Sequence, residues 1–463
     1  MTNLVASRPA TAGEEVAPSR VPAPVLAVLA LGPVAVAVFA VMRGNGIYLL
    51  GAVGFVVALL VSVSLHEGGH FLTARHYGMK ATQFFVGFGP TIWSRQRGET
   101  EWGFKIIPAG GFVKIVGMTA LEEVEPGDED RAFYKQPAKQ RAVVLAAGST
   151  VHFIIAVVLI LLSSLFIGKA VEKAPGLGMI RPCVPAAADL DCDDGGAIIP
   201  GPAQAAQLAA GDTVLAIDGE PVEGVLDFIE RVRAAPGEQL TVTVERGGQT
   251  RDIALTPAPV LRSALRPLME DGEPVLREGQ LVFPTERVGE IGVQLEFRQG
   301  TESLGPVEAL GHSVDTIGQV VTGIYTTFRE KLPSITQVYG PDRDPQGFVG
   351  VVGAGRISGE VLASDETLAF KVLGFFGLIA GLNFFVGVFN LLPLLPLDGG
   401  HIAVLTFEQA RDKVKRVFGY RGPLRRVDLR KLLPLTYVVV LFFAGFTVFL
   451  LGADIVNPIR LNP

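Results

Sequence analysis

Charged residues are scarce in this chain of 463 residues. Only 19% are Asp, Glu, Lys or Arg, whereas 49% are hydrophobic. This composition points to a membrane protein rather than to a set of soluble domains. Five stretches contain no Asp, Glu, Lys or Arg and are long enough to cross a bilayer: Val21 to Met42, Ile47 to Leu65, Ala142 to Gly168, Val372 to Leu397 and Leu433 to Gly452.

The chain also has no excess of positive charge. Its net charge is −6, and its basic residues gather in loops next to the predicted spans. Anionic lipid headgroups account for basic residues in such places, and no nucleic-acid-binding motif is present. We therefore expect the lipid bilayer as a partner and exclude nucleic acid.

The basic residues also predict how the chain crosses the membrane. They are concentrated between the second and third spans and again between the fourth and fifth, so both loops are predicted to be cytoplasmic. The same alternation places the segment from about Lys169 to Phe370 outside. His66, His70 and the start of the loop after Leu397 then share the cytoplasmic side.

Cysteine is nearly absent, with only Cys183 and Cys192 in the chain. Both lie in the segment predicted to be outside, where the compartment permits oxidation. The short loop between them favours a disulfide, and two buried free thiols are the alternative.

The first residues carry no predicted core. Residues 1–20 are rich in Ala, Ser, Pro and Glu and are predicted to be a disordered cytoplasmic tail. We interpret residues 21–42 as an additional retained span. A cleaved signal peptide is less favoured, because the apolar run is too long and no small-residue cleavage site follows it.

The sequence His66-Glu67-Gly68-Gly69-His70 ends the second uncharged run. On a helix, His66 and His70 share one face, and both imidazoles can reach one zinc ion while Glu67 lies beside them to take a proton from water. Ionisable groups at the edge of a membrane span are costly and usually functional. The motif therefore predicts a zinc-dependent hydrolase, although it is only moderately specific by itself.

His76 follows His70 by six residues, a spacing at which one class of zinc protease supplies a third histidine. That class has a glycine where this chain has Thr73, because the chain must turn back toward the metal. Without that turn, His76 lies off the His66 and His70 face. We interpret it as an interfacial histidine rather than a ligand.

The fourth run ends in NLLPLLPLDGGH, from Asn390 to His401. Prolines break a helix, and freed backbone groups at membrane depth are tolerated only where protein encloses them. Catalytic zinc takes three protein ligands, so the two histidines and Asp398 complete the set. The alternative for Asp398 is that it caps a helix. The alternative for Asn390 is that its amide bonds to backbone groups freed at the helix kink.

Two stretches of the first basic loop, Phe84 to Pro90 and Trp102 to Met118, mix aromatic and β-branched residues with glycine and proline. They are predicted to form short strands joined by turns, a membrane-associated β-ribbon. An unpaired strand edge can add a strand from an unwound peptide. A plain cytoplasmic hairpin is the alternative.

The outside segment contains a compact strand-and-helix pattern from Pro200 to Pro257. An Ala-Gly-Asp turn, an Asp-Gly hairpin, a helix near Val225 to Ala234 and a strand at Leu240 to Arg246 resemble a circularly permuted PDZ domain. We place this α+β domain at residues 196–258. Residues 259–367 are predicted to add further strands and one helix at Ala309 to Phe328, either amphipathic or part of a core.

Together these stretches resemble the site-2 protease family of intramembrane zinc metalloproteases, in particular its bacterial PDZ-containing members. The resemblance runs from about Ile47 to the C-terminus and rests on HEGGH, on PAGGFVK from Pro108 to Lys114, on the PDZ-like stretch and on the sequence from Asn390 to Gly400. The membrane core would be split into residues 47–168 and 368–452.

The resemblance implies a Zn²⁺ cofactor held by His66, His70 and Asp398, with Glu67 as the general base. It also implies that Asn390 is a polar contact to the substrate or the oxyanion, and that three residues of the second motif contact substrate: Gly110, Gly111 and Phe112. Implied substrates are single-span membrane proteins, such as anti-sigma factors or signal-peptide remnants, trimmed first by another protease. The family cuts these substrates within their membrane-spanning segments.

The sequence departs from the family at Ala147 to His152, where a proline and an asparagine are common. We expect His152 to satisfy a neighbouring span rather than to contact substrate. The alternative to a protease is a membrane zinc-binding protein without peptidase activity, such as a transporter. A transporter has no need for Glu67, and its pathway requires further ionisable residues that the other spans almost entirely lack.

Overall fold

A computed structural model describes residues 45–118, 124–185, 198–270, 273–277, 280–340, 343–344, 347–422 and 426–460. The predicted tail at residues 1–20, the additional span at residues 21–42 and Cys192 lie outside these ranges. The chain forms two compact units, residues 1–167 with 303–463 and residues 168–302.

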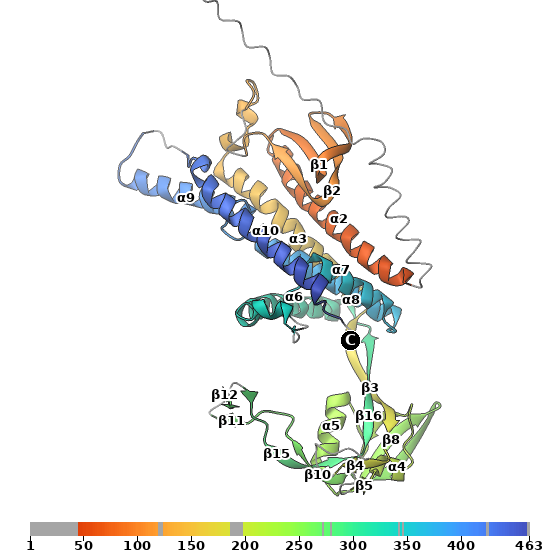
Figure 1. Ribbon diagram of the computed structural model, residues 1–463. Coiled ribbons are helices and arrows are strands. Elements are labelled where there is room, and N and C mark those ends of the chain that lie inside the picture. The colour runs from red at the N-terminus through yellow and green to blue at the C-terminus, as the bar shows by residue number, and fades with distance from the viewer. Residues whose placement is uncertain are drawn as a thin grey trace, which may run out of the picture. The chain divides into compact units, whose positions relative to one another are not determined.

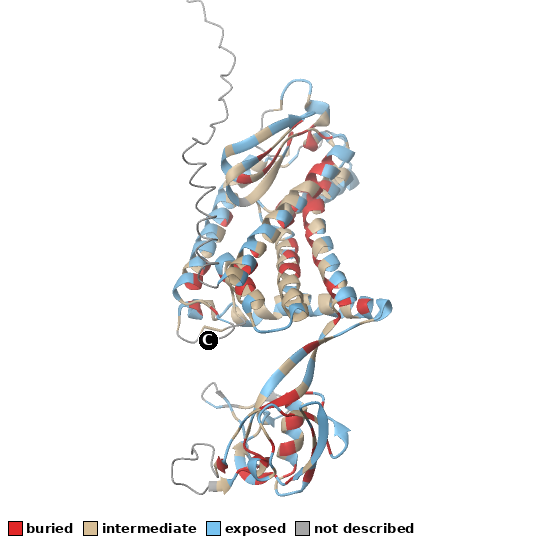
Figure 2. Cartoon of the chain, turned by 90° about the vertical axis from the view of Figure 1, so that its right-hand side faces the viewer, coloured by how far each residue is buried: buried red, intermediate tan, exposed pale blue. Residues whose placement is uncertain are grey.

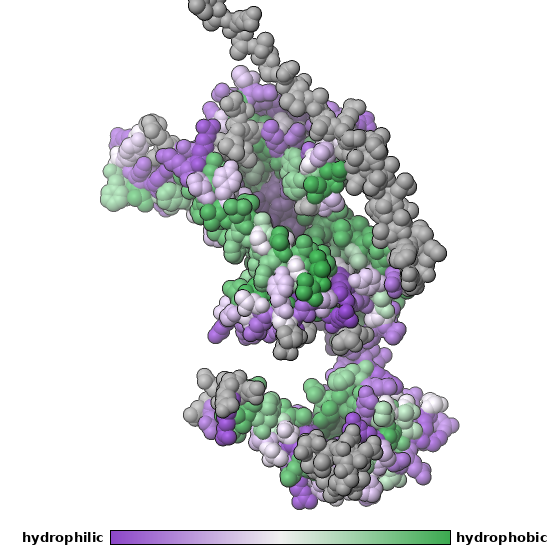
Figure 3. Space-filling view, viewed as in Figure 1, coloured by the Kyte–Doolittle hydropathy of each residue, from purple (hydrophilic) through white to green (hydrophobic). Residues whose placement is uncertain are grey.

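In the described residues of the first unit, four helices are long and apolar enough to cross a membrane. They coincide with four of the predicted spans and are labelled in Figure 1: α2 (Gly46–His76), α3 (Ala138–Phe166), α8 (Leu368–Asn390) and α10 (Leu433–Val456). Many of their large apolar side chains are exposed, as expected for surfaces that face lipid. Figure 3 shows these apolar surfaces in green over the helices.

The ends of α2 and α8 agree with the sequence. At about 1.5 Å per residue, the 31 residues of α2 span more than a bilayer core, so α2 continues past the membrane edge. It stops just before Gly78, whose φ of +74° is the left-handed conformation typical of a helix end. Helix α8 ends at Asn390, and Pro393 and Pro396 lie in the loop that follows.

Helix α3 is the most buried of the four and packs against α2 and α8. Figure 2 shows buried residues alternating with exposed ones along the helices, so each helix meets its neighbours on only part of its surface. The described part of the unit also contains α6 (Pro306–Lys331), α7 (Val351–Ala363) and α9 (Asp398–Val417). The helix predicted at Ala309 to Phe328 is α6, and its Ser313 donates a hydrogen bond of 3.3 Å to Ser164 of α3.

The prediction that the ribbon consists of short strands is wrong. The chain forms one long antiparallel hairpin of β1 (Ala81–Arg97) and β2 (Thr100–Ile115). Gly87 and Gly89 take positive φ angles, and the register shifts near them, so the glycines bend the strand instead of ending it. The base of the hairpin packs on α2 and α3 through a cluster of buried apolar residues that includes Phe71 and Phe84.

The second unit is built on a sheet in the order β16-β3-β6-β8-β9, with β7 paired to β6. The helix and strand predicted at Val225–Ala234 and Leu240–Arg246 have those bounds in the structure. The sheet extends beyond the predicted PDZ-like stretch, because β3 and β16 come from either side of it. Its elements are β3 (Lys169–Ile180), α4 (Pro202–Ala205), β6 (Thr213–Ile217), β7 (Glu220–Pro221), α5 (Val225–Ala234), β8 (Leu240–Arg246), β9 (Gln249–Leu255) and β16 (Val293–Glu302).

Smaller strand pairs complete the second unit. They are β4 (Cys183–Pro185) with β5 (Ile198–Pro200), β10 (Ala258–Ser263) with β15 (Thr285–Glu290), β11 (Met269–Glu270) with β12 (Glu273–Pro274), and β13 (Leu276–Arg277) with β14 (Gln280–Leu281). Cys183 is buried and belongs to a disulfide. Its predicted partner Cys192 lies outside the described residues, so the pairing stays a prediction.

Candidate metal centre

Two histidines of α2 form the base of the site. His66 and His70 lie one helical turn apart, and both are buried. Their Nε2 atoms are 3.2 Å from each other. The backbone carbonyl of Val144 accepts a hydrogen bond of 2.7 Å from Nδ1 of His70, which leaves the Nε2 lone pair of His70 free to bind a metal.

Asp398 reaches the histidines from the other half of the sequence. It is the first residue of α9, and its Oδ2 atom lies 3.5 Å from Nε2 of His66 and 3.3 Å from Nε2 of His70. The proline loop after α8 brings the chain back to this position. Gly399 is required there, because a Cβ atom at this position would lie 2.2 Å from the carbonyl oxygen of Leu391.

The three groups fit a zinc ion. Ligands at about 2.0–2.1 Å around a tetrahedral metal lie about 3.3 Å from one another. The observed separations of 3.2, 3.3 and 3.5 Å match this value. Oδ2 of Asp398 is buried and has no hydrogen-bond donor among the described residues, as expected for an atom whose partner is a cation. The described part of the chain offers this group of three as a possible metal site.

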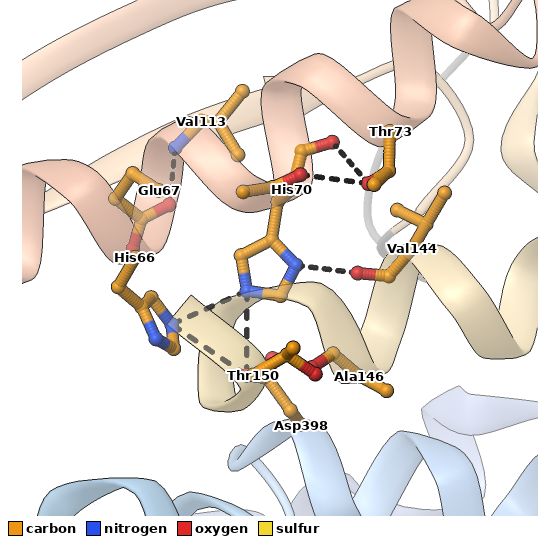
Figure 4. A network of polar contacts seen from close by, with 10 residues as sticks. His66, Glu67, His70, Thr73, Val113, Val144, Ala146, Thr150 and Asp398 are labelled. Carbon is orange, nitrogen blue, oxygen red and sulfur yellow. Dashed lines mark hydrogen bonds and ion pairs between the residues drawn. The ribbon is translucent and has the colours of Figure 1, made fainter. Parts of the chain in front are cut away.

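Glu67 lies beside the ligands and contacts the ribbon. Its Oε2 atom accepts a hydrogen bond of 3.0 Å from the backbone N–H of Val113 in β2, as Figure 4 shows. Gly111 packs over the same side chain, because a Cβ atom there would lie 3.3 Å from Cγ of Glu67. Of the three ribbon residues predicted to bind substrate, Gly111 is therefore next to Glu67, the predicted general base. Phe112 stacks on Phe85 within the ribbon.

The other expected contacts have different surroundings. Gly110 has a φ of +146° and packs against the ring of Phe88. Asn390 is the last residue of α8 and is half-buried, eight residues before Asp398. His76 is exposed at the end of α2 and lies outside the group of three ligands.

Sequence reasoning missed Gly148 of α3. A Cβ atom at this position would lie 2.4 Å from both Cε1 of His66 and Nε2 of His70. Only glycine therefore lets α3 pass this close to the two imidazoles. The signal was a glycine inside an apolar helix, which often marks a close approach.

A buried polar network lies beside the candidate metal ligands. His152 of α3 donates from Nδ1 to Oδ1 of Asn383 in α8 at 2.8 Å, and Nδ2 of Asn383 donates to Oγ of Ser62 in α2 at 3.1 Å. As expected, His152 satisfies a neighbouring span. Its ring centroid is 4.9 Å from that of His66. Asn383 and Ser62 were missed, although a single amide within an apolar span is itself a signal.

Comparisons with known proteins agree with this geometry. The sequence matches peptidase family M50 over residues 54–420. It is 38% identical over 428 residues to the zinc metalloprotease Rip1 of Mycobacterium tuberculosis. The aligned region covers 89% of this chain and 99% of the relative.

Two further relatives have similar names. The zinc metalloprotease Rip1 of Mycolicibacterium smegmatis is 34% identical over 424 residues, covering 89% of this chain and 98% of the relative. A putative zinc metalloprotease of Rhizobium meliloti is 28% identical over 373 residues, covering 78% of this chain and 87% of the relative. The chain is therefore a zinc metalloprotease of the membrane, and it belongs to peptidase family M50, the site-2 protease family.

Proposed function

We propose that this protein is an intramembrane protease that cuts peptide bonds within the membrane-spanning segments of single-span membrane proteins. The observation that carries the proposal is the position of the metal centre. Ligand atoms of His66, His70 and Asp398 lie 3.2–3.5 Å apart, and two of these residues belong to a membrane-length helix. A peptidase site in that place favours substrates that are themselves in the membrane.

His66, His70 and Asp398 would hold the zinc ion, and Glu67 would move the proton. Bound zinc supplies Lewis acidity, which polarises the scissile carbonyl and makes a water molecule more acidic. Glu67 takes the proton of the attacking water and passes a proton to the leaving amine, so a single carboxylate serves both steps.

The ribbon is suited to hold substrate in an extended conformation. A helical peptide bond is shielded by its own hydrogen bonds, so the substrate must unwind before attack. In the described residues β1 and β2 form a sheet of two strands, which leaves unpaired edges for strand addition. We propose that Gly110, Gly111 and Phe112 guide this strand and that Asn390 contacts its backbone.

The resemblance supports anti-sigma-factor-like proteins or signal-peptide remnants as substrates, cut in regulated intramembrane proteolysis. We place the metal centre toward the cytoplasm and the second unit outside, because Lys and Arg are enriched in the loops on the metal-centre side. The second unit is then a PDZ-like domain that excludes substrates with an intact outer domain. Trimming by another protease would precede the cut.

Reconstitution into liposomes without other proteases tests the proposal. A single-span substrate with a short outer stub is added, and mass spectrometry locates the bond that is cut. We expect a cut within the apolar segment, and we expect the same substrate with an intact outer domain to be cut more slowly. Cuts confined to soluble tails would contradict an intramembrane protease.

A further inference from the structure

The helix that begins at the metal ligand Asp398 has two different halves. The first half of α9 is anchored in the protein: Leu405 belongs to a buried apolar cluster, and Glu408 lies 3.5 Å from the Arg141 guanidinium and accepts a hydrogen bond of 2.8 Å from the backbone N–H of Val427. From Gln409 onward, most residues of α9 are exposed.

An apolar stripe runs from Phe407, just before the exposed half, to the end of α9. Phe407, Ala410, Val414 and Val417 follow one another at intervals of three and four residues, which places them on one face of the helix. Phe407 is 59% exposed, Val414 54%, Val417 77% and the adjacent Phe418 85%. An exposed stripe of this kind marks a surface that contacts a protein or a membrane.

Basic residues flank the stripe. Residues 409–422 contain one acidic residue, Asp412, and five basic residues: Arg411, Lys413, Lys415, Arg416 and Arg421. Asp412 pairs with Arg411 at 2.8 Å. Lys413 and Arg416 have no ion-pair partner among the described residues. Figure 3 shows green side chains along one edge of α9 and purple ones along the opposite edge, at the position of α9 in Figure 1.

The depth of α9 is fixed by the helix that precedes it. Helix α8 is apolar and of membrane length, and only the seven loop residues 391–397 separate it from α9. The start of α9 therefore lies close to the membrane boundary, and the stripe begins nine residues further along this helix, at Phe407. A helix with a narrow apolar face and a basic polar face lies in the plane of the interface, where its cations meet anionic headgroups.

We propose that the second half of α9, together with Phe418, docks on the leaflet at the metal-centre side. The apolar stripe enters the boundary of the acyl chains, and Lys413, Lys415 and Arg416 contact anionic phospholipid headgroups. Charge complementarity and the depth set by α8 select a lipid surface over a protein groove or a second copy of the chain.

Spin labels test this docking on the full-length protein in nanodiscs. Single cysteines replace Val414, Val417 or Arg416, and the unsubstituted protein reports any background labelling. Collisions with oxygen, which partitions into lipid, are compared with collisions with a water-soluble nickel chelate. We expect oxygen to dominate at positions 414 and 417 and the chelate to dominate at position 416. Dominance of the chelate at all three positions would overturn the proposal.

Charge variants test the choice of anionic lipid. The neutral variant carries Lys413→Gln, Lys415→Gln and Arg416→Gln, and its control carries Lys413→Arg and Lys415→Arg. Each is labelled at Val414→Cys and measured in phosphatidylcholine with and without phosphatidylglycerol. In the control, we expect phosphatidylglycerol to raise the ratio of oxygen collisions to chelate collisions several-fold, which reports a deeper label. Added salt should reverse this change. The neutral variant should not respond.

Two outcomes would overturn the inference. One is an equal response of the neutral and control variants to phosphatidylglycerol. The other is dipolar broadening between labels at position 414 of different chains, which would identify a second copy of the protein as the occupant of the stripe.

Discussion

The carboxylate of Glu67 accepts a hydrogen bond of 3.0 Å from the backbone N–H of Val113. The proposed general base is thus held by the same strand that we propose to guide substrate. Gly111 of this strand packs against the Glu67 side chain. The position of the ribbon therefore determines where the base can reach.

Gly111→Ala is expected to lower kcat about tenfold or more, because displacement of a reacting group by a fraction of an ångström weakens catalysis strongly. The new methyl group would lie 3.3 Å from Cγ of Glu67 and 3.1 Å from the Phe85 carbonyl oxygen. Zinc content should stay the same. Gly377→Ala is the control, because nothing lies within 4 Å of a Cβ atom there. Equal kcat values for the two variants would contradict the contact.

The three proposed ligands can be separated from the remaining histidine of α2. His66→Ala, His70→Ala and Asp398→Ala should each lose zinc from the purified protein, because each removes one of three protein ligands. His76→Ala should keep it, because His76 is exposed and lies outside the group. Metal analysis decides the matter. Zinc loss in His76→Ala together with full zinc in Asp398→Ala would identify a different third ligand.

The buried network predicts a loss of stability. Asn383→Leu removes hydrogen bonds that join α8 to α2 and α3, and it leaves His152 without its partner. We expect the free energy of unfolding in detergent to fall by about 1 kcal/mol, a typical value for hydrogen bonds between membrane helices. Thr447→Val is the control, since in the described part of the chain the Thr447 hydroxyl bonds to Phe443 of its own helix alone. No difference between the two would show that the network contributes nothing.

The second unit should be sensitive to acid through Asp212. The side chain of Asp212 is fully buried and accepts two hydrogen bonds of 2.6 Å from Arg246. These bonds lower the pKa of Asp212, although burial opposes them. Because the folded pKa lies below the unfolded value of about 3.9, the stabilisation is present above that pH and disappears as the pH falls through the folded pKa.

Arg246→Gln should therefore destabilise the second unit at neutral pH by about 2 kcal/mol, since the buried carboxylate loses its charged partner and keeps only the backbone N–H of Ala209. The difference from the unsubstituted protein should shrink as the pH falls below about 4. Hydrogen exchange of peptides from β8 and β9 measures the effect, and Arg287→Gln, at an exposed position of β15, is the control. An equal effect of the two substitutions at neutral pH would contradict a special role for the pair.

Local patterns predicted much of this molecule. Long stretches without charged residues predicted four of the observed helices, because a membrane span can be identified from the residues of the span alone. The interval of four residues between His66 and His70 predicted their shared helix face, and the ligand count of zinc led to Asp398 in a distant segment.

What the sequence did not predict depends on contacts between distant segments. Gly148 matters only because α3 crosses the two imidazoles, and Asn383 only because α2 and α3 lie beside it. The continuity of β1 was missed because its glycines bend a strand that the hairpin partner holds together. The extent of the second unit was missed because β3 and β16 are direct neighbours in the sheet but are separated in the sequence by the other strands of the unit.

The most direct test of the central claim is cleavage by the Glu67→Gln variant in liposomes that contain no other protease. Glutamine has nearly the shape of glutamate and can still accept the hydrogen bond from Val113, but it cannot take a proton. We predict full zinc content, unchanged substrate binding and a rate at least about a hundredfold lower, with uncut substrate accumulating. Undiminished cleavage by this variant would contradict Glu67 as the general base and the mechanism built on it.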